Sequence, residues 1–154
     1  MTNIEGVTIL LSYEERTEDL IKRTFSDFYY GLYDKAYNIN QKEGYYIKGL
    51  SSWGVAQSKN ETLYYATIKY VYKDSDVDDK KCSEGKKACK EMMWFEMASG
   101  ITKEEFEEDL ENKLNSINKK SNQTVKEISE RMAPKDEPFR YIAIITYTEV
   151  SDLM

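Results

Sequence analysis

Aromatic and arginine side chains are the residues of this sequence whose types and spacing could recognise a ligand. Seven aromatic residues gather in one predicted hairpin: Tyr45, Tyr46, Trp53, Tyr64, Tyr65, Tyr70 and Tyr72. Aromatic rings stack on nucleobases, and an arginine guanidinium group holds phosphate through paired hydrogen bonds. The pattern predicts a ligand site whose candidate residues are Trp53, Tyr45, Tyr65, Arg131, Arg140 and Arg23. The alternative is that the tyrosines form the half-buried face of a sheet, as their strand preference predicts.

Two of these arginines flank the turn of a second predicted hairpin. Arg131 precedes this turn and Arg140 follows it, so we expect them to lie close together across the two strands. If the two halves of the chain pack together, this hairpin should lie beside Trp53. The seam between the halves is therefore the expected place for a nucleotide pocket.

The sequence predicts a protein without catalytic activity. It contains no histidine, which excludes a Ser-His-Asp or Cys-His arrangement, and it has no glycine-rich phosphate-binding loop. Asp74, Asp76 and Asp78 resemble the start of a calcium loop, but Asp79 occupies the position where an EF-hand needs glycine. We therefore expect no catalytic residue, no metal site and no cofactor, and we interpret the aspartates as a solvated loop.

Charge and composition limit the partners of the protein. The net charge is −6 and the isoelectric point is about 4.9, which disfavours direct binding to a nucleic-acid backbone. No apolar run approaches the length of a membrane span. We predict a cytoplasmic location, in a host cell if the gene belongs to a phage, and we expect Cys82 and Cys89 to be free thiols there.

The first half of the chain predicts a strand, a helix and a hairpin. Residues 6–13 form a short apolar run typical of a strand. Ser12 and Glu15 have the spacing of a capping box, and apolar residues at intervals of three and four predict a helix over residues 15–33. Two strands follow, at residues 45–57 and 63–73.

The second half repeats this order after a charged segment. Residues 74–90 are predicted to be a linker or an exposed loop that contains both cysteines. A strand at 91–97 precedes a helix that begins with a capping box of Thr102 and Glu105. The apolar stripe of this helix is Phe106, Leu110, Leu114 and Ile117. Strands at 125–132 and 139–150 complete the chain.

The two halves also match in their residues. Tyr64, Ala66, Ile68 and Tyr70 align with Tyr141, Ala143, Ile145 and Tyr147, so the shared residues occupy one face of one strand. Ile21, Phe25 and Phe28 align with Leu110, Leu114 and Ile117 in the helices. We predict an α+β protein of two β-α-β-β repeats related by pseudo-twofold symmetry, with antiparallel sheets and one helix each. The repeats are residues 1–73 and 91–154, and they form one compact unit. The alternative is two unrelated hairpins that share an amphipathic strand pattern.

The closing strand Tyr141-x-Ala143-x-Ile145-x-Tyr147 and the acidic helix before it resemble a family of small sporulation proteins, each about the size of one repeat. Phage proteins of this general build resemble Thoeris anti-defence sponges, which bind cyclic ADP-ribose signals without degrading them. The resemblance implies a sponge that sequesters a cyclic nucleotide immune signal, and a homo-oligomer is compatible with it. It assigns no ligand residues.

Two further functions remain open at this stage. An acidic protein can occupy the basic groove of a nucleic-acid-binding enzyme, as inhibitors of CRISPR or restriction enzymes do. The segment from Asp74 to Asp79 and the acidic helix after Glu104 favour this function. A sporulation-associated interaction module without a small ligand is the third candidate.

Overall fold

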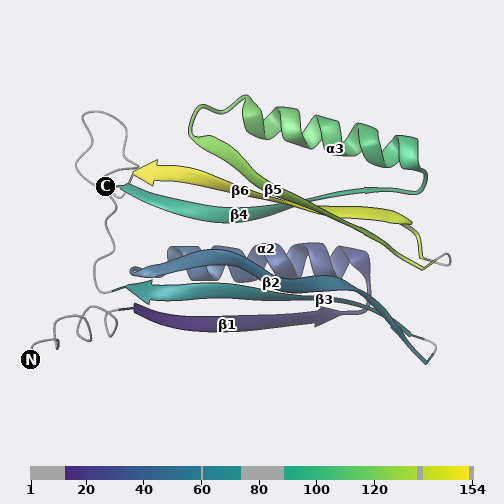
Figure 1. The fold of residues 1–154 in the computed structure, drawn as a ribbon, viewed down its shortest axis with the longest axis horizontal. Helices are drawn as coiled ribbons and strands as arrows, with labels where there is room; N and C mark the ends of the chain where they lie inside the picture. The colour runs from purple at the N-terminus through teal and green to yellow at the C-terminus, as the bar shows by residue number, and fades with distance from the viewer. Residues whose placement is uncertain (1–12, 60, 74–88, 135–136, 153–154) are drawn as a thin grey trace, which may run out of the picture.

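The computed structural model describes residues 13–59, 61–73, 89–134 and 137–152, which form six strands and two helices (Figure 1). In chain order the elements are β1 (Tyr13–Lys22), α2 (Phe25–Gln41), β2 (Tyr45–Ser58), β3 (Glu61–Lys73), β4 (Cys89–Gly100), α3 (Lys103–Asn118), β5 (Gln123–Met132) and β6 (Tyr141–Asp152). All strand pairs are antiparallel, in two sheets of order β1-β3-β2 and β4-β6-β5. The predicted α+β class, with two antiparallel sheets and one helix for each, is confirmed.

The beginning of the first half differs from the prediction. Residues predicted as the first turns of a helix form β1, and the helix begins ten residues later at Phe25. The side chains of β1 alternate, because Leu20 is 4% exposed and faces the core while Ile21 is 64% exposed. The capping box at Ser12 and Glu15 is wrong, since Thr24 caps the helix by accepting a hydrogen bond from the Asp27 amide at 3.1 Å. The predicted strand at 6–13 lies outside the described residues except for Tyr13.

The second half follows the prediction closely. Helix α3 begins with the predicted capping box, in which Thr102 and Glu105 each bond to the backbone amide of the other. The strands agree with the predicted ones to within a few residues. One correction is that Cys89 and Lys90 belong to β4 and not to the linker. The rest of the linker, with Cys82 and the aspartates after Lys73, lies outside the described residues.

The two halves share a detail of their strand pairing. In β2 the register shifts by one residue between Ile47 and Gly49, and in β5 it shifts between Val125 and Glu127. Ile47 and Val125 lie opposite Tyr70 and Tyr147, which are equivalent tyrosines of the predicted repeat. One bulge therefore lies at the same place in each sheet relative to its central strand, while the second shift of β2, between Leu50 and Ser52, has no counterpart in β5.

The two helices have different surroundings. Helix α2 packs on its own sheet through buried Phe28, Leu32, Ala36 and Ile39, and it also contacts β4 of the other sheet (Figure 1). Asn40 of α2 donates to the carbonyl oxygen of Met93 at 2.9 Å, and the rings of Tyr33 and Trp94 stack at 5.9 Å. Tyrosine suits this seam because it offers an apolar ring and a polar tip.

Helix α3 packs on β4, β5 and β6 of its own sheet and turns an acidic face to solvent. The exposed residues of that face include Glu104, Glu107, Glu108 and Glu111. A twofold axis would give both helices the same surroundings. The contacts of α2 with the other sheet therefore do not support the predicted pseudo-twofold relation.

A buried lysine ties the end of α2 to the second sheet. The last turn of α2 contains no basic residue, and Lys90 of β4 donates to the carbonyl oxygens of Asn40 at 2.9 Å and Lys42 at 3.2 Å. Its ammonium group also lies 5.0 Å from the centre of the Tyr46 ring. Cations stabilise helix C-termini because the last carbonyls carry partial negative charge. Lys90 is 5% exposed, so these contacts replace the water that it loses.

Candidate functional site

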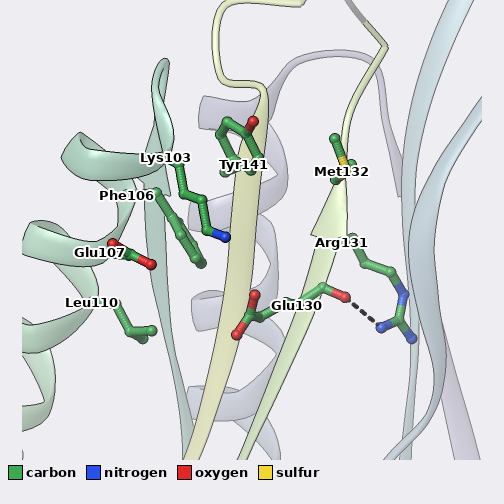
Figure 2. Close-up of a pocket in the computed structure, with 8 residues that line it drawn as sticks. All are labelled: Lys103, Phe106, Glu107, Leu110, Glu130, Arg131, Met132 and Tyr141. Carbon is green, nitrogen blue, oxygen red and sulfur yellow. Dashed lines mark hydrogen bonds between the residues drawn. The ribbon is translucent and has the colours of Figure 1, made fainter.

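A groove of about 490 Å³ lies between α3 and the strands β5 and β6 (Figure 2). Its lining residues are Lys103, Phe106, Glu107, Leu110, Glu130, Arg131, Met132 and Tyr141. The rings of Phe106 and Tyr141 lie 6.1 Å apart, tilted by 33°. Met132 is 56% exposed at one side. An apolar floor with a few charged groups at its border is typical of ligand sites.

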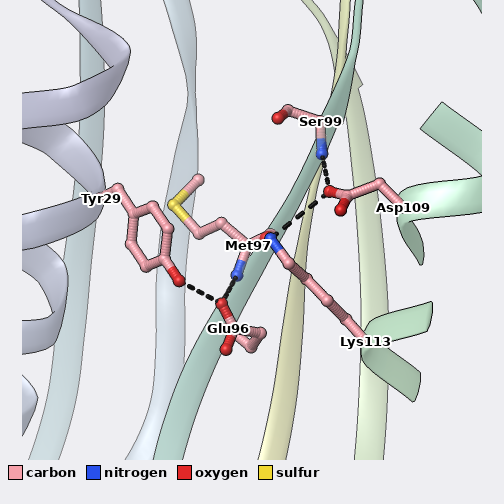
Figure 3. A network of polar contacts seen from close by, with 6 residues as sticks. All are labelled: Tyr29, Glu96, Met97, Ser99, Asp109 and Lys113. Atoms are coloured by element: carbon pink, nitrogen blue, oxygen red, sulfur yellow. Dashed lines mark hydrogen bonds and ion pairs between the residues drawn. The ribbon is translucent and has the colours of Figure 1, made fainter. Parts of the chain in front are cut away.

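The groove is open because α3 is fixed near β4. A Cβ atom at Gly100 would lie 2.3 Å from the backbone nitrogen of Phe106, so only glycine allows this close approach. Asp109 accepts from the backbone amide of Ser99 at 2.9 Å, and Lys113 donates to the carbonyl oxygen of Met97 (Figure 3). These contacts hold the helix toward β4, and the groove lies on the β5 side of the sheet.

The charged side chains at the groove have both signs. Lys103 reaches over β6 between Phe106 and Tyr141, while Glu107 and Glu130 flank it from the helix and from β5 (Figure 2). Arg131 is directed away from the floor of the groove and donates to the carbonyl oxygen of Glu130 at 2.8 Å. Lys103 is thus the cation best placed to meet a bound ligand, and the two carboxylates disfavour a ligand of high negative charge.

The polar network between α2, β4 and α3 has a structural role (Figure 3). Tyr29 donates to the carboxylate of Glu96, which also accepts from the backbone amide of Met97 at 3.0 Å. Together with Asp109 and Lys113, these side chains occupy backbone groups on the outer edge of β4. Free edge groups are able to pair with other chains, and the network gives the Met97 and Ser99 backbone groups partners within the protein.

Two tyrosines beside this network should make stability depend on pH. Burial, followed by the hydrogen bond to Glu96, raises the pKa of Tyr29 well above its usual value, and burial together with the charge of Glu96 raises the pKa of Tyr147 to about 12. A raised pKa favours the neutral phenol in the folded state. The two neutral phenols contribute their full stabilisation of the folded state below the pKa of an unfolded tyrosine, which is near 10. This stabilisation is lost as the pH rises toward 12.

We therefore expect the free energy of unfolding to fall between about pH 10 and pH 12. The Tyr29→Phe, Tyr147→Phe double variant should lose less stability over this interval than the parent chain. Urea unfolding at several pH values measures the difference. Parallel curves for the two proteins would contradict the assignment.

The structure brings together two of the predicted site residues, Trp53 and Arg131. The guanidinium carbon of Arg131 lies 4.6 Å from the centre of the Trp53 ring, and the Trp53 indole donates to the Ser129 hydroxyl at 3.0 Å. The predicted meeting of the two halves at these residues is therefore observed. The adjoining cavity is only about 130 Å³, and Trp53 is 5% exposed. A typical ligand pocket is at least about 300 Å³, so this seam is too small for a cyclic dinucleotide.

The other predicted site residues lie elsewhere. Tyr45 accepts a hydrogen bond from Arg16 at 2.9 Å, roughly 25 Å along β2 from Trp53. Tyr65 neighbours Ala66, the partner of Trp53 in the ladder, and so points to the opposite face of the sheet. Because of this separation, the six candidates do not form one pocket.

Both remaining arginines have local partners. Arg23 forms an exposed ion pair with Glu61 at 2.9 Å. Arg140 donates across its turn to the carbonyl oxygen of Ala133. The expectation that Arg140 would join Arg131 in holding phosphate is not supported by this geometry.

Of the residues that line the groove, Arg131 alone was among the predicted site residues. Phe106 and Leu110 were predicted as an apolar helix stripe and Tyr141 as a strand residue. One sequence signal could have indicated the groove. The charged residues Lys103 and Glu107 lie close to Phe106 at the start of the apolar helix stripe. In the part of the chain that the structure describes, no cluster of metal-binding side chains occurs, and neither helix is long and apolar enough to cross a membrane.

Comparisons of the chain with protein-family models, with curated proteins and with solved structures give no match.

Proposed function

We propose that this protein is a non-enzymatic binding protein that captures a ring-bearing ligand in the groove between α3 and β5. The observation that carries the proposal is the groove itself, with the rings of Phe106 and Tyr141 on its floor and Lys103 above them. Capture lowers the concentration of free ligand by mass action and leaves the ligand unchanged.

A cyclic nucleotide sponge is one form of this function. The groove volume of about 490 Å³ lies within the range of small-molecule sites. Phe106 or Tyr141 would stack on a base, and Lys103 would meet a phosphate. The carboxylates of Glu107 and Glu130 favour a ligand with few phosphates over one with many.

Calorimetric titration with cyclic ADP-ribose isomers and cyclic dinucleotides tests the sponge. We expect a Kd of micromolar or below for at least one of them, and heat should release that ligand intact. Lys103→Met should weaken binding about tenfold, which corresponds to one charge-assisted hydrogen bond. Lys119→Met, on the exposed end of α3, is the matched control and should leave binding unchanged. Weaker than micromolar binding to the whole panel would exclude the sponge.

The matched halves of the chain support a duplicated origin, which we include in the proposal. Both halves have the same element order, the same strand order and a bulge at the same place. The N-caps Thr24 and Thr102 each precede a buried phenylalanine by four residues. Phe28 is therefore equivalent to Phe106 in the alignment of the two repeats. The predicted alignment of Phe28 with Ile117 is wrong, because it treated Ile21 as a helix residue and Ile21 lies in β1.

A further inference from the structure

The first repeat contains a counterpart of the groove, and in that repeat it is filled. Tyr64 pairs with Lys22, two residues before Thr24, and Tyr141 pairs with Gly100, two residues before Thr102. Phe28 and Tyr64 of the first repeat therefore correspond to Phe106 and Tyr141 of the second. Phe28 and Tyr64 are both 0% exposed, and their rings stack at 5.9 Å.

The first groove is filled by Glu137 and Phe139, which precede β6. Phe139 packs against Phe25 with ring centres 5.0 Å apart. Glu137 accepts a hydrogen bond from the Tyr64 hydroxyl. An aromatic ring and a carboxylate thus occupy the space beside α2.

We infer that the groove between α3 and β5 binds an exposed turn of a partner protein, one that presents an aromatic side chain and a carboxylate. This inference rests on the proposed function and names the class of ligand. The ring would pack on Phe106 and Leu110 in the groove. Lys103 stands at the position of Phe25, which is the residue that Phe139 contacts in the first repeat.

Charge complementarity supports this occupant. Lys103 stands one position after its N-cap, where the first repeat has Phe25, and its ammonium group reaches into the groove (Figure 2). A partner carboxylate at the Tyr141 hydroxyl would take the place that Glu137 has at the Tyr64 hydroxyl, and Lys103 would supply a nearby positive charge. Glu130, which lies opposite Ala143 as Trp53 lies opposite Ala66, would accept a basic group flanking the ring.

A second copy of this chain is a poorer occupant. Its turn between β5 and β6 is already seated in its own first repeat. The corresponding turn between β2 and β3 contains Lys59 and Glu61 but no aromatic residue from Gln57 to Thr62, and Glu61 is paired with Arg23. The partner is therefore a protein of different sequence.

An NMR titration of the full chain tests the inference. The probe is a cyclised peptide with the sequence of residues 133–140, Ala-Pro-Lys-Asp-Glu-Pro-Phe-Arg. We expect saturable shifts of the backbone amide signals of Phe106, Glu107, Leu110 and Tyr141. A control peptide carrying Phe139→Ala should bind at least about tenfold more weakly, since a buried aromatic anchor dominates such contacts.

Variants of the protein separate the contacts. Tyr141→Phe keeps the ring and removes the hydroxyl, so this protein variant should bind the parent peptide several-fold more weakly. A Glu137→Ala peptide has no side-chain acceptor, so it should bind Tyr141→Phe and the parent protein almost equally. Equal binding of the parent peptide and the Phe139→Ala peptide would overturn the inference. Signal shifts confined to residues outside the groove would also overturn it. Self-association that broadens the groove signals without peptide would overturn it in favour of a second copy.

The outcomes also distinguish this inference from the proposed function. A nucleotide that shifts the groove signals, with no effect of the peptide, would overturn the inference and support the sponge. A groove that responds to neither class would overturn both.

Discussion

Replacing Phe28 by alanine is expected to lower the free energy of unfolding by about 3–5 kcal/mol. Phe28 is fully buried in the cluster shared by both sheets and α2, where it packs beside Tyr64. Its neighbours are held from two sides, because α2 contacts its own sheet and β4. The cavity left by the substitution can therefore collapse only in part. Urea unfolding monitored by circular dichroism measures the loss.

Phe106→Ala is the matched comparison, since Phe106 holds the corresponding position in the second repeat. Phe106 belongs to a small cluster with Ala98 and Ala143 and borders the open groove. We expect a smaller loss of about 2–3 kcal/mol, because the vacated space adjoins solvent. Losses that agree within about 0.5 kcal/mol would contradict the view that one groove is filled and the other is open.

Lys90→Met should destabilise the protein by about 2–4 kcal/mol, even though methionine retains most of the apolar stem. The substitution leaves the carbonyl oxygens of Asn40 and Lys42 without the donor that the structure gives them. It also removes the cation at the C-terminus of α2. An unsatisfied buried polar group costs about 1–3 kcal/mol, which sets the expected size of the loss.

Lys42→Met provides the control for this substitution. Lys42 is exposed, and its ammonium group lies 5.6 Å from the centre of the Tyr45 ring. An exposed cation–π contact contributes about 0.5–1 kcal/mol, so the control should lose no more than that. If Lys90→Met is as mild as the control, then Lys90 does not join the two halves as the structure indicates.

The second half was predictable because its local signals agree with one another. Thr102 and Glu105 mark the start of α3, and the stripe from Phe106 to Ile117 runs entirely within the helix. In the first half two signals competed. Leu20, Ile21, Phe25 and Phe28 have helical spacing across a strand-to-helix boundary, which conceals the N-cap at Thr24. Periodicity alone cannot show that a run of apolar residues belongs to two elements.

The candidate site was predictable only in part, for a different reason. The meeting of Trp53 with Arg131 followed from the expectation that the halves pack together. The groove depends on the lateral position of α3 over its sheet, which Gly100 and Asp109 determine through tertiary contacts. The difference between the two grooves depends on where the turn with Phe139 is seated. Neither feature has a signature in local sequence.

The most direct test of capture in the groove is non-denaturing mass spectrometry of the protein with a bound ligand, peptide or nucleotide. Leu110→Lys is the variant to compare, because it places a charge on the apolar floor of the groove at a half-buried position of α3. We predict one ligand for each parent chain, unchanged in mass after heat release, and loss of that ligand from folded Leu110→Lys protein. A ligand of altered mass, or full retention by the variant, would contradict the account.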